Sequence, residues 1–165
     1  MSLDVIVRPA TPADLPAIIA LQPRAFGPGR FTRTAYRIRD GQPLISRFCL
    51  VVVSGDTLIA TIRFTEVAIG GQPGGLLLGP LAVAPEFAGQ GFGRRLVAEG
   101  LDNARKAGMR LSLLVGDKAY YERFGFNVVP PGQILLPGPA DPARILAAEL
   151  VSGALAEYHG LVTAL

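Results

Sequence analysis

Glycine occupies alternate positions at Gly89, Gly91 and Gly93, between a short apolar segment and an amphipathic helix. Such a turn points successive backbone N–H groups outward at the positive end of the helix dipole, where they can bind phosphate oxygens. Glycine is needed there because a Cβ would keep the phosphate away from the main chain. The pattern therefore predicts a phosphate-binding turn between a buried strand and a helix. Glycines that serve only close packing are the alternative.

Two common phosphate-binding motifs do not fit this turn. The P-loop requires Lys followed by Ser or Thr, and no such pair occurs in the sequence. In the dinucleotide motif, the third glycine would fall on Arg94 when counted from Gly89, and on Leu96 when counted from Gly91. The sequence therefore indicates neither a P-loop nucleotide site nor a Rossmann dinucleotide site.

Hydrophobic periodicity and turn residues divide the chain into alternating strands and helices. Strands are predicted at residues 5–8, 47–53, 57–69, 76–83, 111–115 and 125–129. Helices are predicted at 11–22, 31–40, between Gly93 and Gly108, and at 117–124. Residues 144–151 fit a helix and a strand about equally. Pro80, inside a predicted strand, indicates a bulge or an unpaired edge.

The order of these elements predicts one mixed α/β (α+β) domain over residues 1–165. The length is typical of one domain, and half of the residues are hydrophobic, which is enough for a core. Antiparallel hairpins precede a clear β-α-β crossover. We therefore expect a mixed sheet with helices on both faces.

Composition disfavours several classes of protein. The apolar runs are far shorter than the roughly 18–20 residues of a membrane span, and Asp4 and Arg8 interrupt any secretory leader. We therefore expect a cytoplasmic protein with no membrane partner. The net charge is +3, and the basic residues are scattered except for five arginines between Arg24 and Arg39. Nucleic-acid sites are usually denser, so no nucleic-acid partner is expected, although an arginine-rich binder is one alternative.

The chain has one cysteine, Cys49, and one histidine, His159. One cysteine cannot form an internal disulfide, and these two residues alone cannot form a zinc site. A catalytic triad would depend on His159 alone. We expect Cys49 in the core, His159 at the surface, and no metal.

Two motifs in the chain resemble those of a known enzyme family. The acetyl-CoA-binding motif of the GCN5-related N-acetyltransferases, the GNAT family, is similar to residues 81–96. The second core motif of that family is similar to residues 116–126, which contain Tyr-Tyr-Glu-Arg-Phe-Gly-Phe. The resemblance extends over residues 5–130, with a weaker similarity at 144–155, and is greatest to the bacterial YhbS-like group.

The resemblance implies acetyl-CoA as co-substrate. It also implies a mostly antiparallel sheet of about six or seven strands, with two strands splayed into a V-shaped slot for the cofactor. Ala88 departs from the family pattern, which has Gln or Arg there, so a side-chain contact is lost while the backbone donors remain. Arg94 or Arg95 would add charge near a phosphate, and a solvated helix face is the alternative. The residues implied to bind acetyl-CoA are Leu81, Ala82, Val83, Gly89, Gln90, Gly91, Phe92, Gly93, Arg94 and Tyr121.

The resemblance also implies catalytic roles. Tyr121 would be the general acid that protonates the departing CoA thiolate, and the Val83 N–H would polarise the thioester carbonyl. Packing of a half-buried aromatic ring is the alternative for Tyr121, and Tyr120 is expected in the core. Glu66 is the first candidate for the base and Glu86 the second, and an exposed strand carboxylate is the alternative reading of Glu66.

Two functions are consistent with these residues. The first is acetyl transfer from acetyl-CoA to a primary amine by direct attack in a ternary complex. The acceptor would be a small molecule, a peptide or a protein, and the family implies that the enzyme can be a homodimer. The second is a non-catalytic acyl-CoA-binding module with a regulatory or scaffold role. Tyr121 favours the enzyme, whereas Ala88 and the unassigned base favour the module.

Overall fold

The computed structural model describes residues 4–26 and 45–165. Its strands are β1 (Ile6–Pro9), β2 (Leu50–Ser54), β3 (Thr57–Ile69), β4 (Gln72–Val83), β5 (Leu111–Val115), β6 (Asn127–Val128), β7 (Ile134–Leu135), β8 (Ile145–Glu149) and β9 (Gly160–Ala164). Its α-helices are α1 (Leu15–Phe26), α3 (Phe92–Lys106) and α4 (Lys118–Tyr121). Short 3-10 turns are η1 (Pro12–Asp14), η3 (Pro85–Phe87), η4 (Glu122–Phe124), η5 (Pro142–Arg144) and η6 (Ala154–Glu157). The predicted helix at 31–40 lies outside the described residues.

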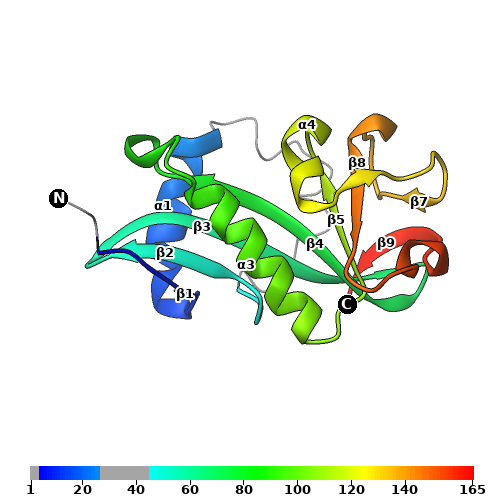
Figure 1. Ribbon diagram of the computed structural model, residues 1–165, viewed down its shortest axis with the longest axis horizontal. Helices are drawn as coiled ribbons and strands as arrows, with labels where there is room; N and C mark the ends of the chain where they lie inside the picture. Colours follow the sequence, from blue (N-terminus) through cyan, green and yellow to red (C-terminus); the bar gives the residue numbers. More distant parts are fainter. Residues whose placement is uncertain (1–3, 27–44) are drawn as a thin grey trace.

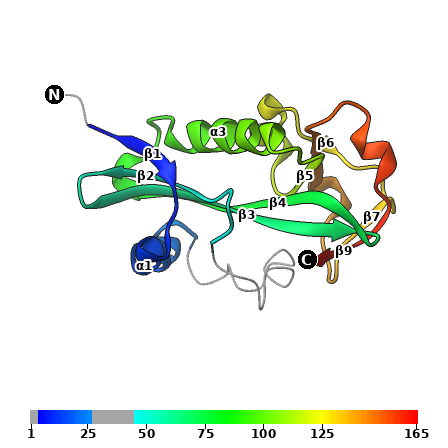
Figure 2. The ribbon, with the colours of Figure 1, turned by 90° about the horizontal axis from the view of Figure 1, so that it is seen from below.

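Within the described residues, nine strands join into one sheet. Its main path has the order β1-β2-β3-β4-β5-β8-β6, and β9 pairs with both β3 and β7. The described pairs are antiparallel except β4 with β5 and β7 with β9. Figure 2 shows α1 on one side of the sheet and α3 on the other. The predicted mixed, mostly antiparallel sheet is confirmed, and the short strands β7 and β9 enlarge it beyond the expected number.

Strand β4 contains the bulge that Pro80 predicted. On β3, Ile62 pairs with Leu81 and Phe64 with Leu78, so two residues of β4 face a single residue of β3. An extra residue on one strand of a pair bends that strand and increases its local twist. The bulge therefore changes the direction of β4 before it reaches α3.

Strands β4 and β5 pair over a short stretch and then separate (Figure 1). Gly75–Leu77 of β4 pairs with Leu111–Leu113 of β5. Beyond these residues β4 pairs with β3, and β5 pairs with β8. The two parallel strands thus diverge toward the start of α3, which matches the splayed arrangement that the resemblance implied.

Helix α3 covers one face of the sheet and lies close against it at Gly100. A Cβ at Gly100 would overlap the Phe64 ring of β3. Glycine therefore lets the helix lie directly against an aromatic ring of the sheet. The other buried residues of the helix include the predicted apolar stripe, Leu96, Val97, Leu101 and Ala104.

The opposite face of the sheet has three apolar groups. One surrounds Leu21 of α1, one includes Val51 of β2 and Ile18 of α1, and the third surrounds Tyr158 near the C-terminus. Side chains of β3 at Ala60, Ile62 and Phe64 belong to the core beneath α3. Side chains alternate between the two faces along a strand. The residues that alternate with these three therefore point to the opposite face, and they are Thr61, Arg63 and Thr65. The centre of that face is therefore polar.

Several predicted boundaries differ from the structure: α1 begins at Leu15, β2 at Leu50, and β6 covers only Asn127–Val128. Helix α1 continues through Pro23 to Phe26, because a proline removes its own backbone donor but not the donors of the residues that follow. Strand β4 begins at Gln72, earlier than predicted, since pairing with β3 extends to the turn at Gly70. Within the ambiguous residues 144–151, Ile145–Glu149 form strand β8, because β5 and β6 pair with it on either side.

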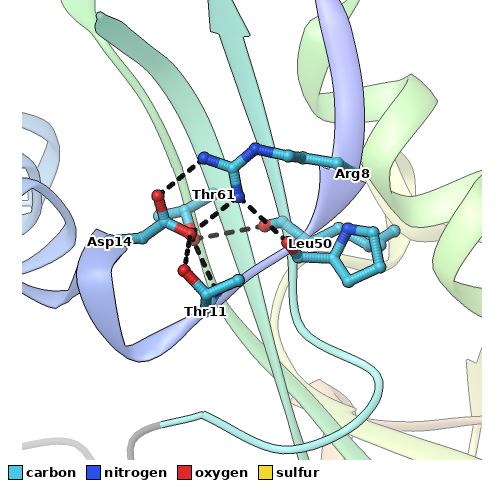
Figure 3. Close-up of polar contacts among 6 residues, drawn as sticks. Arg8, Thr11, Asp14, Leu50 and Thr61 are labelled. Atoms are coloured by element: carbon cyan, nitrogen blue, oxygen red, sulfur yellow. Dashed lines mark hydrogen bonds and ion pairs between the residues drawn. The ribbon is translucent and has the colours of Figure 1, made fainter.

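A charged cluster joins β1 to the start of α1 (Figure 3). The Arg8 guanidinium donates two hydrogen bonds, both 2.8 Å, to the carboxylate of Asp14. The same carboxylate accepts a 2.8 Å hydrogen bond from the Thr11 N–H. The hydrogen bond from Arg8 lowers the pKa of Asp14 well below its usual range.

The contact at Gly100 predicts a packing cost for Gly100→Ala. Alanine favours helix by about 1 kcal/mol, but the added methyl group displaces Phe64, and overpacking costs about 1–3 kcal/mol. We expect a net loss of about 1–2 kcal/mol in the free energy of unfolding, measured by urea denaturation. Asn103→Ala, on the exposed side of the same helix, serves as the control and should cause no loss. Unchanged stability of Gly100→Ala would contradict the observed packing.

The low pKa of Asp14 predicts a pH-dependent contribution to stability. Its unfolded pKa is about 3.9, so the contribution is complete above that value and is lost as the pH falls toward the lower folded pKa. Asp14→Asn should cost about 1 kcal/mol at neutral pH, and the difference from the unsubstituted protein should shrink below about pH 4. Denaturant titrations across this range measure it. Asp102→Asn, which removes the exposed ion pair with Lys106, should show almost no difference at any pH.

Candidate functional site

The glycine-rich turn lies open at the start of α3. Gly89 and Gly91 have positive φ angles of +78° and +85°, and no atom lies within 4 Å of a Cβ placed at either. Gly91 is the N-cap of α3, and its carbonyl accepts from the Arg95 N–H at 3.1 Å. The N–H groups that precede Arg95 in the first turn have no partner one turn back in the helix. The turn thus has the open space and the backbone donors that a phosphate group requires.

The main-chain groups of Leu81 and Val83 point away from β3. Hydrogen-bonded and non-hydrogen-bonded residue pairs alternate along an antiparallel ladder. The Ala84 N–H donates to the Ile59 carbonyl at 2.8 Å, so Ala84 and Ile59 form a hydrogen-bonded pair. By alternation, the neighbouring pair at Val83 is non-hydrogen-bonded, and so is the pair at Leu81, two residues earlier. Their N–H and C=O groups therefore face the side from which β5 has diverged. An extended ligand chain could bind there as an added strand.

The two tyrosines of the second motif have different surroundings. Tyr121 packs against the core beneath α3, and its ring lies next to Gly116. Tyr120 is half-buried, and its hydroxyl would lie 3.3 Å from a Cβ placed at Gly93. The expectation that Tyr120 packs in the core is therefore wrong, because the turn of α4 directs it toward the first turn of α3. The rings of the two tyrosines meet edge to face, with centroids 4.8 Å apart.

The start of α3 brings several of the expected site residues together. Around Gly93 lie the Tyr120 hydroxyl and the side chains of Leu81 and Val83, whose carbon atoms would be 3.6 Å from an added Cβ. Phe92 packs edge to face on Phe87 of η3, with centroids 6.3 Å apart. The remaining residues of the turn, Ala88, Gln90 and Arg94, are exposed. Ala82 is buried on the opposite side of β4 with Leu21 of α1.

The structure does not bring Glu66 to this group. Val83 pairs with Ala60, and Glu66 lies six residues further along β3, which is roughly 20 Å at the usual rise per residue. Its carboxylate accepts hydrogen bonds of 2.9 and 3.3 Å from Arg47. The hydrogen bond with Glu66 raises the pKa of Arg47. Glu66 therefore joins β3 to the turn that precedes β2 through an ion pair.

Two other charged candidates form ion pairs at the protein surface. Glu86, in η3, forms an ion pair with Arg24 of α1. Arg95 forms an ion pair with Glu99 one turn later, at 3.1 Å. Arg95 thus belongs to the solvated helix face, whereas Arg94 is exposed next to the turn.

The remaining candidates lie away from the turn. Cys49 is buried, with 3% of its surface exposed, as predicted, and accepts a hydrogen bond from the Ser46 N–H at 3.3 Å. His159 is exposed, as predicted. In the described part of the chain, no three His, Cys, Asp or Glu residues gather as a metal would require. Over the same residues, no helix combines the length and apolar character needed to cross a membrane.

Comparison with known proteins identifies the family. Residues 6–129 match the family model described as the acetyltransferase (GNAT) domain. The chain belongs to the GNAT family of acetyltransferases. It is 29% identical over 159 residues to the uncharacterised N-acetyltransferase YhbS of Escherichia coli K12. The aligned residues cover 96% of this chain and 95% of YhbS.

Two solved GNAT structures share the fold. The crystal structure of Escherichia coli YhbS in complex with CoA has a TM-score of 0.84, covering 100% of this chain and 92% of that one. The structure of a Brucella melitensis GNAT acetyltransferase in complex with acetyl-CoA is 31% identical and has a TM-score of 0.65, covering 93% of this chain and 99% of that one. The resemblance to the GNAT family and to YhbS is thereby confirmed.

The polar face of β3 is a feature for which no role was predicted. A signal for it was present, because Thr61, Arg63 and Thr65 alternate with apolar residues inside a predicted strand. Such alternation indicates that one face of a strand is polar. Only the structure shows that this face lies beside the divergence of β4 and β5.

Proposed function

We propose that this GNAT protein transfers the acetyl group of acetyl-CoA to a primary amine by direct attack. The observation that carries the proposal is the combination of an open glycine turn at α3 with outward-facing main-chain groups on β4. The turn supplies donors for phosphates, and Leu81 and Val83 supply donors and acceptors for an extended arm. The acetyl-CoA complex of the Brucella melitensis relative supports the choice of co-substrate.

Acetyl-CoA supplies an acyl group activated as a thioester. In this proposal the turn from Gly89 to Arg94 binds the phosphates through its N–H groups. The Arg94 side chain adds a positive charge, which compensates in part for Ala88. The Val83 N–H donates to the carbonyl oxygen of the acyl group, and one such donor contributes about 3–4 kcal/mol to stabilising the developing oxyanion.

Proton transfers complete the proposed reaction. The amine nitrogen bonds to the carbonyl carbon, the C–S bond breaks, the amine loses a proton and the thiolate gains one. Tyr121 gives the proton to the thiolate, since a phenol with a pKa of about 10 can hydrogen-bond to a thiolate whose conjugate acid has a pKa of about 8.5. Glu66 is left out of the proposal, because it lies six residues along β3 from the partner of Val83 and is paired with Arg47. The amine proton leaves through water, and water returns a proton to Tyr121, which restores the phenol for the next turnover.

The proposal extends to the setting of the reaction. The enzyme acts in the cytoplasm, needs no metal, and binds neither nucleic acid nor membrane. The acceptor is an amine of a small molecule, a peptide or a protein, and the active form can be a homodimer.

A non-catalytic acyl-CoA-binding module is the second candidate. Ala88, at the family's Gln or Arg position, and the ion pair that occupies Glu66 favour it. Calorimetry with acetyl-CoA and a thiol-release assay across a panel of amines separate the two functions. We expect binding together with amine-dependent thiol release. Binding without thiol release from any amine would support the module instead.

The glycine turn predicts a selective loss of acetyl-CoA binding in Gly91→Val. Valine disfavours the positive φ of +85°, and its side chain covers the N–H groups of the turn. We expect calorimetric affinity to fall at least about a hundredfold, since several charge-assisted hydrogen bonds are lost. Gly108→Val is the matched control, because Gly108 ends the same helix with a φ of +86° and equal open space. Equal loss of affinity in both variants would refute the assignment.

The surroundings of the tyrosines predict different effects of removing each hydroxyl. Tyr121→Phe should lower kcat at least about tenfold, with little change in acetyl-CoA affinity, because general acid catalysis contributes a factor of about 10²–10⁴. Tyr120→Phe, which keeps the ring contacts, should lower kcat less. Steady-state thiol release for the two variants measures the difference. A Tyr121→Phe enzyme with unchanged kcat would remove Tyr121 from the mechanism.

A further inference from the structure

Arg63 and Thr65 form a polar patch on the face of β3 opposite α3, which we term the β3 patch. Thr65 is 6% exposed, and its Oγ1 atom is buried without a hydrogen-bond partner. Buried hydroxyl groups nearly always have a partner, because an unsatisfied one loses its hydration without compensation. The unsatisfied hydroxyl of Thr65 therefore points to a ligand group at this place.

Thr61 shows that a buried threonine of β3 can have a hydrogen-bond partner for its hydroxyl. It lies on the same strand and face and is 4% exposed. Its Oγ1 donates to the Leu50 carbonyl of β2 at 3.3 Å. The strand thus carries one satisfied and one unsatisfied buried threonine, four residues apart.

The β3 patch lies beside the place where β4 and β5 separate. Thr65 pairs with Leu77, and Leu77 is the last residue of β4 that pairs with β5. Arg63 lies between Ile62 and Phe64, opposite the bulge of β4. The extended arm of acetyl-CoA would enter from the turn at α3 and run back along Val83 toward the bulge. Its acetyl group would then lie near this patch.

We propose that the β3 patch binds the carboxylate of the acceptor, so that the preferred substrates are primary amines that carry a carboxylate, such as free amino acids. This inference rests on the proposed acetyl transfer and names its substrate class. The guanidinium of Arg63 and the hydroxyl of Thr65 are both hydrogen-bond donors, and a carboxylate offers acceptors only. The positive charge of Arg63 makes the hydrogen bond charge-assisted. A carboxylate held there would direct the amine of the same molecule toward the acyl group.

The test compares amino acids with the corresponding amino-acid amides as acceptors in the thiol-release assay. The two sets differ only in the carboxylate. For the unsubstituted enzyme we expect kcat/KM to be at least about tenfold higher for the amino acids, since a charge-assisted hydrogen bond is lost with the amides. In Arg63→Met and Thr65→Val this preference should fall at least about tenfold, mainly through KM.

Thr61→Val is the matched control for Thr65→Val. Thr61→Val loses a hydrogen bond and should lower the melting temperature while keeping the preference for amino acids. Thr65→Val removes an unsatisfied hydroxyl, so its melting temperature should stay the same or rise. Affinity for acetyl-CoA, measured by calorimetry, should be unchanged in both variants.

A second readout does not depend on turnover. In the presence of CoA, N-acetyl amino acids should raise the melting temperature of the unsubstituted protein more than N-acetyl amino-acid amides do, and Thr65→Val should abolish the difference. Equal kcat/KM for amino acids and amides would overturn this inference and leave the proposed function intact. Absence of thiol release with every amine would contradict the proposed function itself.

Discussion

The separation of β4 from β5 is the constraint on which the site depends. Pairing between the two parallel strands stops at Leu77, and the bulge at Gly79 and Pro80 turns β4 before it enters the glycine-rich turn. A sheet that stayed paired to its end would have satisfied the main chain of Leu81 and Val83 internally. The divergence leaves these groups facing outward, next to the helix start whose dipole favours anions.

The two faces of the sheet have different structural roles. On one face, α3 packs against Phe64 through Gly100, which fixes the start of the helix relative to β4. On the other face, apolar groups beneath α1 and around Tyr158 leave a polar centre on β3. A buried polar centre costs stability unless a ligand or a neighbour satisfies it. Its position beside the divergence is the reason for assigning it to the acceptor.

Particular residues show how far sequence reasoning reaches. The glycine-rich turn before α3 and the apolar stripe on α3 were predicted correctly, because turn chemistry and helical spacing are local properties. Two predictions were wrong. Glu66 was expected at the reaction site and lies far along β3 from Val83, and Tyr120 was expected in the core and lies next to Gly93. The position of Glu66 depends on which residue of β4 it faces, and that register follows from pairing between strands. The direction of Tyr120 depends on how α4 lies relative to the first turn of α3, to which the Tyr120 hydroxyl is close.

The amino-acid sequence by itself determined the order of strands and helices, the bulge at Pro80 and the glycine-rich turn before α3. These features follow from periodicity, from the missing N–H of proline and from the conformational freedom of glycine, all of which act over a few residues. Only the tertiary structure decided that Glu66 pairs with Arg47, that Tyr120 reaches Gly93, and that Thr65 is buried without a partner. Each of these depends on segments far apart in the chain, whose contacts are set by sheet register and by packing between layers.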